Sequence, residues 1–202
     1  MTVRMKRREI TRADILPMQA YEAVRASKRA EMRAAKRNRQ LGVGPHAMFT
    51  FESYDSMWLQ VHEMLRIEKG GDAQIDDELA AYNPMIPEPG QLCATLFIEL
   101  TSNDQMREWL PKLVGIEKSL VMVLADGSKV RCVVDEQHAE GLTRETVTAA
   151  VHYVRFDFTP SQVETFAKGG VQLRCDLSNY LEAIELPDFT VTELLTDLRD
   201  DA

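Results

Sequence analysis

The segment SLVMVLADGSKVRCVVD, at residues 119–135, decides the fold class of this chain. Two strand-like runs flank Asp126-Gly127, a dipeptide that tolerates the positive φ angles of a tight turn. This pattern is typical of a β-hairpin, whose strands are antiparallel and need no crossover helix between them. We therefore expect an antiparallel sheet in the second half of the chain.

The segments on either side of this hairpin carry both strand and helix signals. Thr159, Pro160 and Gln162 suit the N-cap, N1 and N3 positions of one helix. Further strands are expected at residues 46–52, 92–100, 146–158, 171–176 and 180–186, and further helices at 53–68, 75–82, 102–113 and 190–198. We predict an α+β fold: a mostly antiparallel sheet with helices packed on it, plus a basic N-terminal helical arm.

The first 40 residues carry a charge opposite in sign to the rest. They hold 12 Lys and Arg against 4 Asp and Glu, a net charge of +8, whereas the remaining 162 residues hold 12 against 28, a net charge of −16. Pro17 indicates the start of a long helix and Gly42 its end. We predict a basic helical arm at residues 1–42 and a single α+β domain at residues 43–202.

This arm has few apolar residues, so we expect the body to hold it weakly and mainly by charge. Its basic side chains recur at spacings of three and four residues, which places them along one stripe of the helix. The stripe consists of Arg25, Arg29, Arg33, Lys36 and Arg37. It is a candidate contact for an anion, a protein partner, a second copy of the chain or the acidic body itself. Nucleic acid is favoured less, because Tyr21 is the arm's one aromatic residue and base stacking has few candidates.

Nothing in the sequence indicates a membrane protein or a disulfide framework. No apolar run reaches the roughly 18 to 20 residues that span a bilayer, and the first ten residues lack the apolar stretch of a signal peptide. A cytoplasmic location is expected.

Cys93, Cys132 and Cys175 lie far apart in strand-like runs without CxxC spacing, so we interpret them as buried free thiols.

Four residues are candidates for a metal site, namely His46, Glu52, Glu68 and His152. Their side chains are suitable metal ligands, but they are far apart in the sequence and only the fold could bring them together. His46 and Glu52 share one face of a predicted strand. The alternatives are structural: a core histidine at 152, and a Glu68 that forms an ion pair or lies at a frayed helix end.

Position along each element also predicts which histidine stabilises the fold. His152 lies on the same strand face as Val154 and Phe156, whereas His62 lies at the flank of its helix. We therefore expect the loss of His152 to destabilise the protein more than the loss of His62. The sequence contains no GxGxxG, Walker or GxSxG motif, which disfavours nucleotide-dependent and serine-nucleophile enzymes. No cofactor can be predicted from it.

Five short segments resemble an uncharacterised bacterial family, known as domain-of-unknown-function family 3501. They are VGPH at 43–46, EMLRIE at 63–68, AYNPMIP at 81–87, LVGIE at 113–117 and AVHYVRF at 150–156. The resemblance implies no established reaction. It implies a gene neighbourhood that often includes rubrerythrin and iron-sulfur oxidoreductase genes, which is an association and not a mechanism.

Three hypotheses for function follow. The first is an uncharacterised cytoplasmic protein that is accessory to a bacterial redox or peroxide-defence system, as the resemblance implies. The second is a small metal- or carboxylate-dependent enzyme with a His/Glu site, which a pocket containing these side chains would favour. The third is nucleic-acid binding through the basic arm.

Overall fold

Eight strands form one strongly curved antiparallel sheet within residues 7–134 and 147–199, the part of the chain that the computed structural model describes. Their order in the sheet is β1-β2-β3-β6-β5-β4-β7-β8. The strands are β1 (Gln40–Val43), β2 (Ala47–Phe51), β3 (Gln91–Ile98), β4 (Leu120–Val123), β5 (Lys129–Val134), β6 (Val151–Asp157), β7 (Gln172–Leu177) and β8 (Tyr180–Glu185). The predicted hairpin at Asp126-Gly127 is confirmed as β4 and β5. The α+β class and the antiparallel sheet are confirmed as well.

Tyr180 brings the two edges of the sheet together. Its hydroxyl donates to the carbonyl of Val43 at 2.7 Å and accepts from the backbone amides of His46 at 2.9 Å and Ala47 at 3.1 Å. Gly44, in the same turn, has a φ angle of 69°, and a Cβ there would lie 2.7 Å from the Tyr180 hydroxyl oxygen. The turn therefore requires glycine, and the sheet is nearly closed into a barrel.

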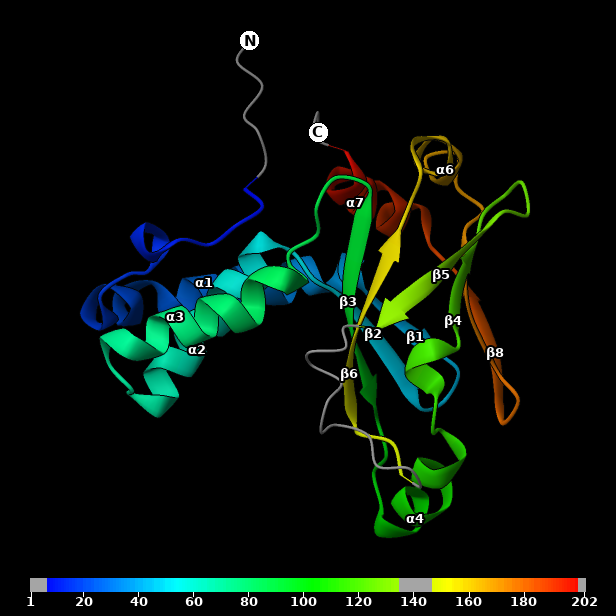
Figure 1. The fold of residues 1–202 in the computed structure, drawn as a ribbon, viewed down its shortest axis with the longest axis horizontal. Coiled ribbons are helices and arrows are strands. Elements are labelled where there is room, and N and C mark those ends of the chain that lie inside the picture. The colour runs from blue at the N-terminus through cyan, green and yellow to red at the C-terminus, as the bar shows by residue number, and fades with distance from the viewer. Residues whose placement is uncertain (1–6, 135–146, 200–202) are drawn as a thin grey trace.

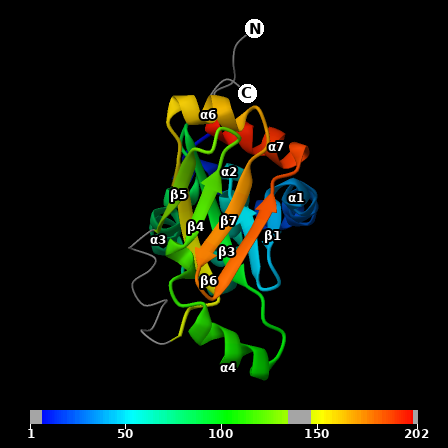
Figure 2. The same cartoon turned by 90° about the vertical axis from the view of Figure 1, so that its right-hand side faces the viewer.

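Helices cover both ends and one side of this barrel (Figures 1 and 2). At one end lies α4 (Asn103–Lys112), and at the other lie α6 (Pro160–Phe166) and α7 (Asp188–Leu198). On the side, α1 (Met18–Arg39), α2 (Tyr54–Glu68) and α3 (Asp72–Tyr82) form a helical layer. Short 3₁₀ turns occur at η1 (Arg12–Asp14), η2 (Asn83–Met85) and η3 (Ile116–Lys118). None of the helices described is long and apolar enough to cross a membrane.

Alternation along the strands gives the sheet two different faces. The inner face carries the main hydrophobic core, which includes Phe49, Leu96 and Phe156. The outer face of β2, β3 and β6 carries polar side chains, such as Thr95, beneath the helical layer. A polar strip of sheet is thereby enclosed between the barrel and the helices.

The basic helix is anchored to the body more firmly than its composition indicates. It ends at Arg39, and Gly42 lies within β1 instead of ending the helix. Tyr21 is 0% exposed, and its hydroxyl donates to Glu63 at 2.5 Å. The Arg39 guanidinium forms a buried ion pair with Asp197 of α7 at 2.6 Å. The contact of this helix with the body therefore combines a buried aromatic side chain with a buried charge pair. The division of the chain after residue 42 stays a prediction.

Removing one member of the Arg39–Asp197 pair should leave an unpaired buried charge. We expect Arg39→Met to lower the free energy of unfolding by about 3–5 kcal/mol, and the double variant Arg39→Met/Asp197→Leu to lose less than the sum of the single changes. Chemical denaturation measures each value. Arg33→Met, on the exposed side of the same helix, is the matched control and should change stability by no more than about 0.5 kcal/mol. Equal losses at positions 33 and 39 would contradict the assigned role of the pair.

His62 lies at the centre of the helical layer and not at the flank of its helix. It is 0% exposed, because the chain before α1 folds across α2. Its Nδ1 donates to the carbonyl of Trp58 at 2.8 Å, and its Nε2 accepts from the backbone amide of Leu16 at 3.0 Å. The Trp58 ring contacts it at a centroid distance of 3.9 Å. Since His152 is also buried, at 4% exposed, the predicted contrast between these two histidines has no structural basis.

Burial lowers the pKa of His62 from its ordinary value of 6.5. A protonated ring could not accept from Leu16, so the folded state favours the neutral form and the unfolded chain takes up the proton first. Stability should therefore fall as the pH drops below about 6.5, at up to about 1.4 kcal/mol per pH unit. His62→Phe removes this proton linkage, so denaturation curves from about pH 7.5 to 5.5 should be flatter for the variant. Parallel pH dependence of the two proteins would refute the linkage.

Candidate functional site

A pocket of about 390 Å³ lies where the helical layer covers the outer face of β2, β3 and β6. The first helix contributes Arg29, Met32 and Lys36, and α2 contributes Ser56, Met57, Leu59, Gln60 and Glu63. The sheet and its flanking turns contribute Thr50, Glu52, Thr95, Phe97, Val151 and Tyr153, and Tyr82 and Met85 complete the lining. We call this cavity the Glu52 pocket. It is a concave site in which several polar groups converge among apolar side chains, as in many ligand sites.

Glu52 is the buried acid of this pocket. It directly follows β2 and precedes Ser53, the N-cap of α2, so the end of the strand and the start of the helix fix its position together. Glu52 is 6% exposed. Its Oε1 accepts from the Thr95 hydroxyl at 2.5 Å, and its Oε2 lies 2.6 Å from the Ser56 hydroxyl oxygen.

The Ser56 hydroxyl can serve either protonation state of Glu52. Its oxygen accepts from the Ser53 amide at 2.8 Å, and its single proton can go to Glu52 or to the Ser53 carbonyl at 3.0 Å. With Glu52 ionised, Ser56 donates to the carboxylate. With Glu52 protonated, the acid donates to Ser56, which donates to the Ser53 carbonyl. Both states keep these groups hydrogen-bonded without movement of a heavy atom.

Burial raises the pKa of Glu52 above its ordinary value of 4.5. The hydroxyls of Ser56 and Thr95 and the nearby charges of Lys36 and Arg39 act in the opposite direction, and burial is the larger effect. A carboxyl whose pKa is raised in a pocket is better suited to donate a proton and then take one back. Glu52 is therefore the candidate acid and base of the site.

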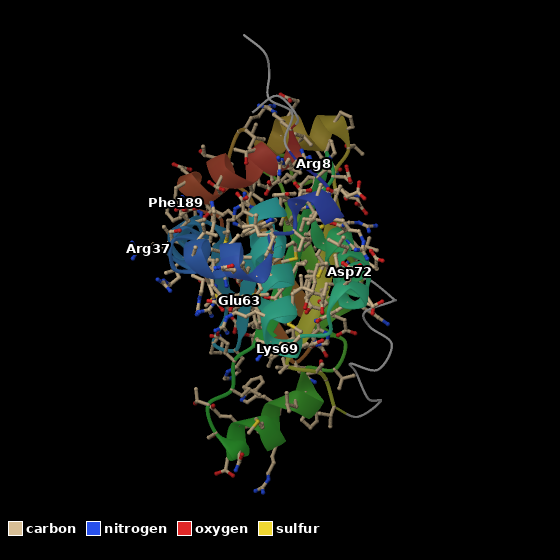
Figure 3. The ribbon with its side chains drawn as sticks, turned by 90° about the vertical axis from the view of Figure 1, so that its left-hand side faces the viewer. Arg8, Arg37, Glu63, Lys69, Asp72 and Phe189 are labelled. Carbon is tan, nitrogen blue, oxygen red and sulfur yellow. The ribbon has the colours of Figure 1, made fainter. Side chains whose placement is uncertain are left out.

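The other ionisable groups around the pocket differ in whether they have partners. Glu63 is held by Arg25, whose Nε and Nη2 lie 2.6 and 2.8 Å from its two oxygens, and this pairing lowers its pKa to about 2. The side chains of Arg29 and Lys36 form no hydrogen bond or ion pair with another residue in the described ranges, although the charge of Arg29 contributes to lowering the pKa of Glu63. Figure 3 shows Glu63 between the first two helices and Arg37 at the outer edge of the layer.

Comparison with known proteins places this fold in a family. The model of the family described as "Protein of unknown function (DUF3501)" matches residues 9–198. The chain belongs to this family. A crystal structure of a protein of unknown function from Burkholderia pseudomallei K96243 is 34% identical in sequence and superimposes with a TM-score of 0.85. That comparison covers 94% of this chain and 99% of the other. Among curated proteins no match was found.

The resemblance to DUF3501 predicted from the sequence is thus confirmed. The family match begins at residue 9 and so includes the basic helix. It also includes the residues of α2 and α7 that this helix contacts. The Glu52 pocket, which this helix partly lines, therefore falls wholly within the family match.

The four predicted metal ligands lie apart in this member of DUF3501. The His46 ring contacts the tilted ring of Trp109 at a centroid distance of 4.4 Å, and Glu68 is exposed and accepts from Gln74 at 3.0 Å. His152 lies on the inner side of the barrel, where its Nε2 contacts the Thr148 hydroxyl at 2.8 Å. In residues 7–134 and 147–199 no group of three or more His, Cys, Asp or Glu is placed to hold a metal ion. Of the four, Glu52 alone lines the pocket.

The predicted basic stripe divides between two environments. Arg25 pairs with Glu63, and Arg29 and Lys36 line the Glu52 pocket. Arg33 and Arg37 are exposed and do not line it. Each residue turns the helix by about 100°, so Arg33 and Arg37 lie about 40° and 80° from Arg29, whereas Lys36 lies about 20° to its other side.

The three cysteines are buried and free, as predicted. Burial raises the pKa of Cys93 to about 12 and that of Cys132 to about 11. Such thiols carry almost no thiolate at neutral pH, so they are poor nucleophiles.

Sequence reasoning missed the pocket residues Ser56, Thr95, Tyr82 and Tyr153. A partial signal existed, because strand parity places Tyr153 opposite to the core residues Val154 and His152. Nothing in the sequence pairs Thr95 with Glu52, since that contact spans 43 positions of the chain.

The raised pKa of Glu52 predicts a specific pH dependence of stability. The folded state keeps a proton that the unfolded state loses above about pH 4.5, so wild-type stability should fall with rising pH by up to about 1.4 kcal/mol per unit until the folded-state pKa is reached. Glu52→Gln removes the titrating group and should become more stable relative to wild type over that window. Urea denaturation across the range measures this difference. Glu68→Gln is the matched control, and a Glu52→Gln curve that stays parallel to wild type would exclude the raised pKa.

Proposed function

We propose that this protein is a small-molecule enzyme that uses Glu52 as its general acid and base. One observation supports this proposal above the others: a buried carboxyl with a raised pKa lines a pocket and is hydrogen-bonded in both protonation states. General acid–base groups work best when their pKa lies near the operating pH, and burial is the usual means of raising that of a glutamate. The reaction class is proton transfer to or from a bound organic molecule, as in isomerisation or elimination.

The residues of the pocket have different proposed roles. Glu52 moves the proton, and Ser56 and Thr95 hold its carboxyl in place. The hydroxyls of Tyr82 and Tyr153 are further candidate hydrogen-bond donors to a bound molecule. The helical layer keeps bulk water from most of the acid. This assignment develops the carboxylate-dependent alternative that the sequence raises.

An accessory role in a cytoplasmic redox or peroxide-defence system is compatible with this chemistry. The support for that role is the family resemblance and its gene neighbourhood. Because the thiols have raised pKa values, we propose that any such role proceeds by turnover of a small molecule and not by thiol exchange. Nucleic-acid binding has less support, since Arg25 is engaged by Glu63 and Arg29 and Lys36 line the pocket.

Turnover can be tested without knowing the substrate. Wild type, Glu52→Gln and Glu68→Gln proteins are incubated with a bacterial metabolite extract, and mass spectrometry follows which masses decline and which appear. We expect at least one substrate–product pair with wild type and Glu68→Gln, and a rate at least about 100-fold lower with Glu52→Gln, the usual size of a general acid–base contribution.

The variant must remain folded for this comparison to hold. Glu52→Gln keeps the shape of the side chain and removes a buried ionisable group. The midpoint temperature of its thermal unfolding should therefore be at least as high as that of wild type near neutral pH. Failure of any metabolite to change with wild type, or equal turnover by folded Glu52→Gln, would overturn the proposal.

A further inference from the structure

The Glu52 pocket carries an excess of positive charge on a protein whose net charge is −8. The negative charge of Glu63 is already balanced by Arg25. The buried acid Glu52 favours its neutral form. Arg29 and Lys36 remain, and no carboxylate within the described part of the chain pairs with either of them. The lining of the pocket is therefore cationic.

Other basic residues of the N-terminal segment are paired with carboxylates. Arg12 bridges Asp72 and Asp76, Arg25 holds Glu63, and Arg39 holds Asp197. Within the described residues Arg29, Arg33, Lys36 and Arg37 have no such partner, and of these four only Arg29 and Lys36 line the pocket. Their charges would be matched by an anion that the pocket receives from outside.

The positions of the two cations indicate the shape of this ligand. Arg29 and Lys36 are seven positions apart, which places them on nearly the same side of α1 and about 10 Å apart along it. Met32 lies between them, and Leu59 and Met85 also line the pocket. Glu52 lies near the Lys36 end, because the charge of that lysine acts on the carboxyl. Charged and apolar groups thus meet in one cavity.

We propose that the pocket binds a small organic carboxylate with an apolar body, whose negative group is held by Arg29 and Lys36. The apolar body lies along the methionines, and this places part of the ligand beside Glu52. An organic carboxylate fits better than inorganic phosphate, because phosphate would leave the apolar lining without a contact. The inference rests on the proposed function, since it names the substrate class of the same site.

Methionine methyl groups allow binding to be located directly. Met32, Met57 and Met85 line the pocket, whereas Met106 and Met122 do not. Full-length protein labelled at the methionine methyls is titrated with hexanoate, with hexanamide and with inorganic phosphate, and NMR shifts are recorded. We expect hexanoate to shift the three pocket methyls and leave Met106 and Met122 in place. Hexanamide, which lacks the charge, should bind at least about 10-fold more weakly, a difference of about 1.4 kcal/mol.

A pair of double variants tests the two cations. Arg29→Gln/Lys36→Gln should weaken hexanoate binding at least about 10-fold, whereas Arg33→Gln/Arg37→Gln, which removes two charges from the exposed side of the same helix, should leave it within about twofold. Both variants keep the anchors Tyr21 and Arg39, and thermal unfolding confirms that each is folded. Equal binding of hexanamide, stronger binding of phosphate, or equal losses in the two double variants would each overturn the inference.

The two proposals fail in different ways. If no probe shifts the pocket methyls but Glu52→Gln abolishes turnover of some metabolite, the carboxylate assignment is wrong and the catalytic one stands. If hexanoate binds as expected and no metabolite is converted, the pocket is a carboxylate-binding site and the catalytic proposal is wrong.

Discussion

The buried ion pair between Arg39 and Asp197 is the contact on which the arrangement of the site depends. It joins the end of the first helix to the last helix of the chain, 158 positions apart. Two charges with side-chain exposures of 6% and 1% are tolerated because each offsets the desolvation of the other. Arg39 also donates to the backbone carbonyl of Glu52 at 3.3 Å and pairs with Glu193 at 2.8 Å. The same guanidinium thus holds α1 against the barrel and fixes the backbone of the pocket's buried acid.

Alternation along three strands supplies the other half of the site. In β2, β3 and β6 one set of side chains fills the barrel, and the other set faces the helical layer. A position on the outer face is polar and yet shielded from water, because helices cover it. This combination explains why a carboxyl can be both buried and part of a pocket lining. On a barrel face open to solvent, burial would not raise the pKa of Glu52.

The sequence predicts what depends on local chemistry. The hairpin at Asp126-Gly127, the cap at Thr159 and the strand face of Glu52 follow from turn propensity, capping and parity, and the structure agrees with each. Features that depend on distant contacts were missed or wrong. The burial of His62 requires Leu16 to cross its helix, and the closure of the barrel requires Tyr180 to reach the turn at Gly44. No local pattern encodes these pairings, because their partners lie 46 or more positions away.

The buried acid and the unpaired cations in the pocket influence each other. Lys36 and Arg39 lower the pKa of Glu52, while burial raises it by more, so the acid is held between two opposing effects. An anion that pairs with Arg29 and Lys36 would cancel part of the cationic influence and bring a negative charge closer to the carboxyl. Both changes disfavour the carboxylate form, so occupancy of the pocket by an anion would favour the protonated acid. An anionic ligand would thereby put Glu52 into the form that can donate a proton to it, which is a physical reason for one pocket to contain both kinds of group.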